Sequence, residues 1–147
     1  MIGDAQIKLS AAQSVAATAD STNHYNMSAA RNIAAGLVKP KLMIQVTTAI
    51  AGASGIVDIE IEFDDNSSFS SGKKILLGSF SVADSWGTTV GDRFEIILSP
   101  NAKYPFERYF QLVYTDNGSN VSAGAVDAWV VLDVPEHTLY PANYTVS

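Results

Sequence analysis

The sequence predicts an all-β domain, a jelly-roll-like antiparallel β-sandwich with an N-terminal arm. Two observations carry this prediction: about seven or eight short apolar or alternating segments follow one another, and turns rich in Gly, Asn, Asp and Ser separate them. No long segment has the helical period. The 147 residues fit one domain, since single domains commonly hold ~100–200 residues. We expect an arm at residues 1–20, the sandwich at 21–135 and a C-terminal tail at 136–147.

Composition excludes several classes of function. The chain has no cysteine, which excludes a disulfide framework, a thiolate zinc site and a cysteine nucleophile. Its 9 Lys and Arg against 15 Asp and Glu give a net charge of −6, so neither nucleic acid nor an anionic membrane is an expected partner. No apolar run approaches the ~18 residues of a transmembrane helix, and the N-terminus lacks the pattern of a secretory signal. Charged residues make up 16%, below the ~25% usual in soluble domains, which indicates a surface partly covered by another protein.

The N-terminal residues 1–20 are rich in alanine, and their apolar positions alternate only weakly through Ile7 and Leu9. We interpret them as an arm, partly a strand; a disordered tail is the alternative. An arm with so little apolar surface would pack weakly on its own core. We therefore expect that deleting residues 1–20 weakens attachment to a partner more than it weakens the fold.

The next stretch, Ser21 to Gly36, reads "STNHYNMSAARNIAAG" and is neither a clean strand nor a clean helix. Its last part forms either a short helical turn closed by Gly36 or a bend between strands. It holds His24 and an isolated Arg31. We expect Arg31 to be a corner residue that pairs with a carboxylate or caps backbone carbonyls.

Strands then follow in regular order. The clearest is Gly55 to Phe63, "GIVDIEIEF", whose alternation predicts one buried apolar face and one wet acidic face. The other expected strands are Leu42–Thr48, Lys73–Val82, Arg93–Ser99, Arg108–Thr115 and Gly124–Val134. Asn117-Gly118 is a favoured hairpin dipeptide, so we expect the last two strands to form a hairpin. Trp129 and Val131 give the last strand a second apolar face, which we expect to be covered.

Candidate chemical groups are few. His24 and His137 lie far apart and lack metal-ligand spacing, so we predict no metal site and interpret them as turn or tail residues. The cluster from Glu60 to Asn66 resembles a calcium loop only faintly, and a solvated strand face that runs into an acidic loop explains it better. The sequence contains no nucleophile elbow and no phosphate-binding motif. It predicts no enzyme activity and no cofactor.

Aromatic and apolar residues outside the regular alternation are the better candidates for function. Tyr and Trp are enriched where protein surfaces meet, and we favour core or interface roles over a sugar-stacking platform. The interface candidates are Ile7, Leu9, Arg31, Trp86, Trp129 and Tyr140.

Several short motifs occur in a fixed order between about residues 4 and 134. They are Asp4-Ala5-Gln6 or Ala12-Gln13, then Ser21-Thr22-Asn23, Ala30-Arg31-Asn32-Ile33, the strand "YFQLVYT", Val121-Ser122-Ala123-Gly124-Ala125-Val126 and Val131-Leu132-Asp133-Val134. This order resembles that of the capsid cement (decoration) proteins of tailed bacteriophages. Asn32 stands in place of the usual acidic residue, Ala34 in place of a glycine, and the tail from Pro135 is extra.

The resemblance implies a jelly-roll sandwich on the outside of a virion. Such a protein is made in the host cytoplasm, binds the outer surface of the major capsid protein shell and stabilises it without catalysis. Homo-oligomers are implied, a dimer before a trimer. The alternative is a carbohydrate- or calcium-binding β-sandwich module of a phage or surface protein. Low charge and many moderate contacts repeated by symmetry suit a cement.

Overall fold

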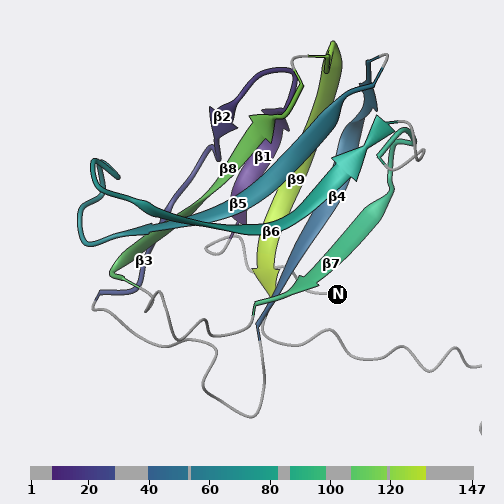
Figure 1. The fold of residues 1–147 in the computed structure, drawn as a ribbon. Helices are drawn as coiled ribbons and strands as arrows, with labels where there is room; N and C mark the ends of the chain where they lie inside the picture. The colour runs from purple at the N-terminus through teal and green to yellow at the C-terminus, as the bar shows by residue number, and fades with distance from the viewer. Residues whose placement is uncertain are drawn as a thin grey trace, which may run out of the picture.

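The computed structural model describes residues 8–28, 40–52, 54–82, 87–98, 107–118 and 120–131, and within these ranges the chain is almost entirely strand and turn (Figure 1). The strands, in chain order, are β1 (Lys8–Ser14), β2 (Ala19–Asp20), β3 (Tyr25–Asn26), β4 (Lys41–Ala51), β5 (Ile56–Asp64), β6 (Lys73–Ser81), β7 (Arg93–Ile97), β8 (Tyr109–Asp116) and β9 (Ala123–Val131). The predicted all-β class is confirmed.

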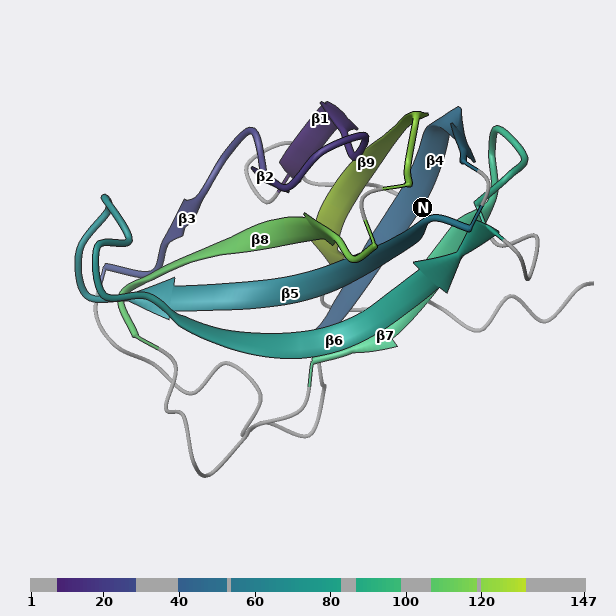
Figure 2. The ribbon, with the colours of Figure 1, turned by 45° about the horizontal axis from the view of Figure 1, so that its top comes forward.

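Two antiparallel sheets form the layers of a sandwich (Figures 1 and 2). The first, sheet A, has the order β1-β9-β4-β7; the second, sheet B, has the order β2-β8-β5-β6, with β3 also pairing with β8. Successive strands cross from one sheet to the other, except within β2–β3 and the β5–β6 hairpin. This alternation, with the first and last strands paired, is the jelly-roll arrangement that the sequence predicted.

The core lies between the two sheets and is built by strand alternation. On β5, every second residue from Val57 to Phe63 is buried, as its period of two predicted. Leu42 and Ile44 of β4 and Val126 of β9 face it from sheet A. Full burial of side chains of this size stabilises the fold by ~1.5–3 kcal/mol each, and this core holds the sheets together.

Residues 8–20 are part of the sandwich, which corrects the expectation of a weakly packed arm. β1 pairs with β9 as the edge strand of sheet A, and Leu9 and Val15 are both 1% exposed within the core. The alternation was hard to see because the pairing shifts register twice along β1. Ala12 adopts a positive φ of 47°, which also breaks the strand. Residues 1–7 lie outside the described ranges.

The expected hairpin between the last two strands is wrong. The chain does turn at Asn117-Gly118, and Gly118 has a φ of 116°. β8 and β9, however, belong to different sheets, and the backbone N–H of Asn117 donates to the carbonyl of Ile56 at 2.8 Å. A turn dipeptide encodes a local reversal of the chain and does not encode which sheet the next strand joins.

Candidate interaction surfaces

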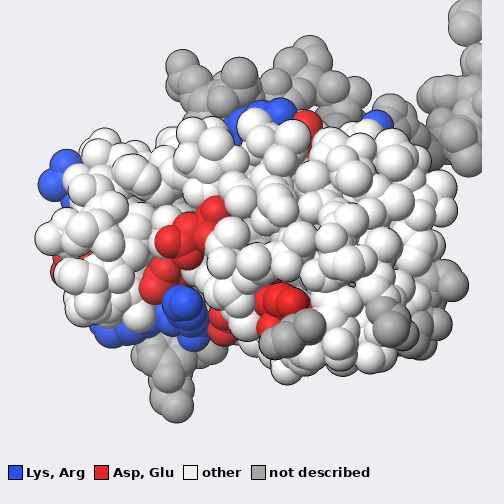
Figure 3. Space-filling model, turned by 90° about the horizontal axis from the view of Figure 1, so that it is seen from above, with Lys and Arg blue, Asp and Glu red and all other residues white. Residues whose placement is uncertain are grey.

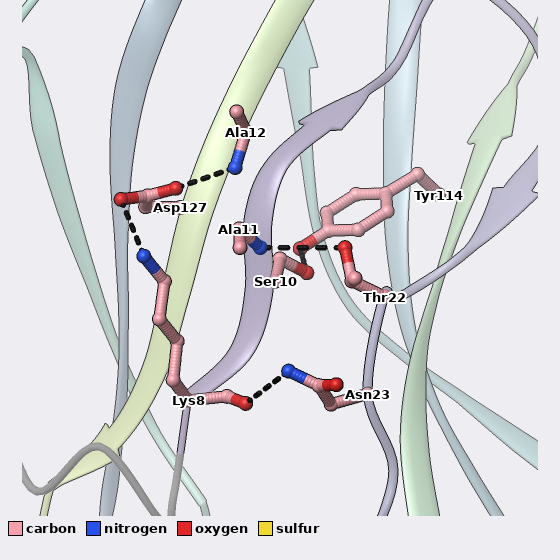
Figure 4. A network of polar contacts seen from close by, with 8 residues as sticks. All are labelled: Lys8, Ser10, Ala11, Ala12, Thr22, Asn23, Tyr114 and Asp127. Atoms are coloured by element: carbon pink, nitrogen blue, oxygen red, sulfur yellow. Dashed lines mark hydrogen bonds and ion pairs between the residues drawn. The ribbon is translucent and has the colours of Figure 1, made fainter.

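The Ser21-Thr22-Asn23 motif links the two sheets along one side of the sandwich. Figure 4 shows the contacts of Thr22 and Asn23 with β1. Ser21 binds sheet B: its backbone N–H donates to the carbonyl of Leu112 at 2.7 Å, and its Oγ accepts the N–H of Leu112 at 3.0 Å. The same hydroxyl donates to the carbonyl of Asn23 at 2.7 Å. Ser21 therefore binds the backbone of β8 in the gap between β2 and β3, where no strand pairs with β8.

The next two residues bind β1 in sheet A. The backbone N–H of Asn23 donates to the carbonyl of Leu9 at 2.8 Å, and its side-chain amide donates to the carbonyl of Lys8 at 3.1 Å. The hydroxyl of Thr22 accepts the N–H of Ala11 at 3.4 Å. Three consecutive residues thus join β8 of one sheet to β1 of the other.

A buried pair of hydroxyls completes this link. Ser10 Oγ and Tyr114 Oη lie 2.8 Å apart, and both residues are fully buried. Burial raises the pKa of the Tyr114 phenol, so the pair is neutral at physiological pH. We call Ser10, Ser21, Thr22, Asn23 and Tyr114 the polar seam; its role is structural.

The outer face of sheet A carries the candidate Trp129, which is half-buried on β9. Lys8 Nζ lies 5.1 Å from the centre of its ring and 2.9 Å from Asp127 Oδ2. The other carboxylate oxygen of Asp127 accepts the backbone N–H of Ala12 at 2.6 Å. Met43 stands opposite Trp129 on β4 and is 3% exposed. Trp129 therefore lies on an apolar face of sheet A, and the ammonium of Lys8 lies over its ring.

The outer face of β5 carries the acidic row that the sequence predicted to be wet. Each carboxylate instead has a side-chain partner on a neighbouring strand: Thr115 donates to Glu60 at 3.1 Å, and Gln111 donates to Glu62 at 2.8 Å. Glu62 is buried, which corrects the expectation for this residue. β5 is a central strand of sheet B, and Asp58 and Glu60 on the same face are partly exposed.

Asp64 organises the loop that follows β5. One of its carboxylate oxygens accepts the N–H of Asn66 at 2.9 Å, and the other accepts the N–H of Ser71 at 2.8 Å. These backbone hydrogen bonds, that of Asn66 first, hold the pKa of Asp64 below its ordinary value. The side-chain oxygen of Asn66 in turn accepts the N–H of Ser68 at 3.0 Å. The described residues contain no group of three or more His, Asp or Glu arranged to hold a metal ion.

His24 lies in the segment between β2 and β3, with its exposed ring edge-on to two aromatic rings. The ring centres of Phe69 and Tyr109 are 5.8 and 5.9 Å away. These contacts are those of a packed turn residue, which is how the sequence was interpreted.

The remaining interface candidates divide into two groups. Leu9 is a core residue and offers no surface to a partner, which corrects its assignment as an interface residue. Ile7, Arg31, Trp86 and Tyr140 lie outside the described residues, as does most of the segment expected to form a helical turn or a bend.

One surface was not predicted from the sequence. It lies where the edge strands β6 and β7 run along the same side of the sandwich (Figure 2). Leu76 and Ile97 are more than half exposed there, beside a groove of about 270 Å³ between the strands. The available signal was the run Ile75-Leu76-Leu77, because three consecutive apolar residues in a strand cannot all face one core.

The residues that build this sandwich match a known protein family. A family model for Bbp16 matches residues 9–130, which spans the sandwich from β1 to β9. The chain belongs to the Bbp16 family. No curated protein matches it. Membership of this family hints at a bacteriophage origin. In the described ranges, no helix has the length and apolar character needed to cross a membrane.

Proposed function

We propose that this Bbp16-family chain is a capsid cement protein, a structural virion protein that binds the outer surface of the major capsid protein shell and stabilises it. The family match over residues 9–130 carries the proposal, because it covers most of the region in which the decoration-protein motifs occur in order. No catalytic step is part of it.

The structure supports the proposal through the positions of those motifs. Ser21-Thr22-Asn23 forms part of the polar seam, and the motif that begins at Val121 leads into β9, a central strand of sheet A. These two motifs, which lie within the described residues, therefore help to build the sandwich. A rigid body suits a cement, since association then costs little conformational entropy.

The character of the surface also supports assembly with protein. Figure 3 shows a face that is mostly uncharged, with the acidic and basic residues gathered in small groups. The net charge of −6 suits a capsid exterior better than contact with a packaged genome. Homo-oligomers, a dimer before a trimer, would multiply moderate contacts with the shell by avidity.

Co-sedimentation tests the proposal directly. Purified chain is mixed with empty, expanded shells of the cognate phage's major capsid protein and sedimented with and without EDTA. We expect the chain to sediment with the shells in both conditions and to raise the temperature at which the shells disassemble. Absence of binding would overturn the cement function. Binding lost only in EDTA would favour the calcium-binding alternative.

A further inference from the structure

The side of the sandwich opposite the polar seam exposes two strand edges. β6 ends sheet B and β7 ends sheet A, and within the described residues each pairs with a single neighbour, β5 and β4 respectively. Figures 1 and 2 show the two strands close together along this side. An exposed edge presents unpaired N–H and C=O groups, which is the backbone chemistry that an added strand requires.

A groove with an apolar floor runs between these two strands. It measures about 270 Å³, and its lining combines the apolar Ile59, Leu77, Phe80, Phe94 and Ile96 with Gly78, Ser79, Arg93 and Glu95. The rings of Phe80 and Phe94 join the two sheets at one end, with their centres 4.3 Å apart. Side chains of an added strand that pointed inward would meet this apolar floor.

Exposed apolar residues flank the groove on both outer faces. Leu76 on β6 is 58% exposed and Ile97 on β7 is 54% exposed. They are two of the three large, strongly exposed hydrophobic residues among those described; the third, Val90, lies in the segment before β7. The groove and its two flanking residues are here called the open edge, and exposed apolar residues beside a groove are typical of protein interaction sites.

Positive charge marks the two ends of the open edge. The arrows of β6 and β7 point in opposite directions along this side (Figure 1), and Phe80, late in β6, lies beside Phe94, early in β7. Lys74 and Arg93 therefore lie at opposite ends. Neither forms an ion pair within the described part of the chain, whereas the ammonium of Lys73 is paired with Glu107.

We propose that the open edge binds an extended segment of a capsid subunit as an added strand beside β6. This inference rests on the proposed cement function. From Lys74 to the end of β6 the edge accommodates about seven residues at ~3.3 Å each. The segment is apolar at alternate positions, which fill the groove, and acidic near both ends, where it meets Lys74 and Arg93. A second copy bound edge to edge is disfavoured, because it would bring Lys74 and Arg93 of one copy close to the same residues of the other.

Paired variants test the open edge on shells. The double variant Leu76→Glu with Ile97→Glu adds negative charge to both flanks, where it repels an acidic segment, and Val90→Glu is the matched control at an apolar residue of similar exposure in the segment before β7. We expect the double variant to bind shells about tenfold more weakly or worse, and the control to bind within about twofold of the unmodified chain. Melting of the free chains should be unchanged, because all three side chains are exposed.

Hydrogen exchange locates the contact in the same experiment. Amides of β6 should exchange more slowly when the chain is bound to shells, and those of β1 should not change. Shell binding by the double variant equal to that of the unmodified chain would overturn the open edge while the cement function stands. A double variant that changes the oligomeric mass of the free chain but still binds shells would assign the edge to a second copy, which also overturns the proposal.

A peptide probe keeps the inference testable if the unmodified chain fails to bind shells, the result that overturns the cement function. The probe is the capped peptide Glu-Val-Thr-Val-Thr-Val-Glu, with a version in which lysines replace both glutamates as its control. Slower exchange along β6 with the acidic peptide alone would support strand addition at the open edge. No change with either peptide would overturn it.

Discussion

The edges of the two sheets meet on both sides of the sandwich, but the residues between the edges differ in kind. Along the polar seam, β1 and β2 end their sheets, and the hydroxyls and amides of Ser21, Thr22 and Asn23 join the two sheets. Along the open edge, β6 and β7 end the same two sheets, and the side chains that line the groove lie between them. Buried polar groups must find partners, and here they tie one side shut within the chain. Apolar side chains have no such requirement, so the other side can remain available to another protein.

The largest expected effect is a difference in the free energy of unfolding between a core variant and a surface variant. Leu9→Ala in β1 should lower the free energy of unfolding by about 2–5 kcal/mol, because it opens a cavity in the core. Leu76→Ala on the open edge should change it by no more than about 0.5 kcal/mol, because the side chain is exposed. Urea denaturation of both variants measures the contrast. Small and equal changes would mean that β1 behaves as the loosely packed arm first expected from the sequence.

A smaller effect isolates the polar seam. Tyr114→Phe leaves the buried hydroxyl of Ser10 without its partner and should cost about 1–3 kcal/mol. Adding Ser10→Ala removes that orphaned group, so the double variant should be more stable than Tyr114→Phe alone. Thermal or urea unfolding of the two single variants and the double variant gives the coupling energy. Simple additivity of the two single effects would argue against a direct hydroxyl pair.

The smallest expected effect depends on pH and falls on Asp64, at the end of β5. Because folding lowers the pKa of Asp64 below its ordinary value of 3.8, its ionised form stabilises the native state above that value. This stabilisation is lost as the pH falls through the lowered native pKa. Asp64→Asn should be less stable than the unmodified chain at neutral pH, and the difference should shrink in acid. A difference in stability that stays constant from pH 6 to pH 2 would contradict the stabilising role assigned to the ionised carboxylate of Asp64.

The sequence predicted regular strands well and irregular ones poorly. β5 was clear because Val57 to Phe63 alternate without interruption, and β6, β7 and β8 followed with nearly correct bounds. β1 was obscured by its register shifts, and β2 and β3 hold only two residues each. Pairing across the sandwich was not encoded locally, so the link from Asn117 to β9 was mistaken for a hairpin.

The candidate surfaces were also predictable only where a local pattern in the sequence marks them. The Ser21-Thr22-Asn23 motif was recognised as a corner, but its partners Leu9 and Leu112 are distant in sequence and only the fold brings them close. The open edge depends on which strands end the two sheets, and this is a property of topology. Only the run Ile75-Leu76-Leu77 marked it locally.

The position of β9 has a consequence for how the chain folds during synthesis. β9 lies between β1 and β4, yet it is the last of the described strands to leave the ribosome. Lys8 and Asp127, which join β1 to β9, are 119 residues apart in the sequence. Contacts this distant slow folding, because most of the chain must be ordered before they form. Until β9 arrives, the nascent chain exposes edges of β1 and β4 that the mature protein conceals, and this interval is when misassembly is most probable.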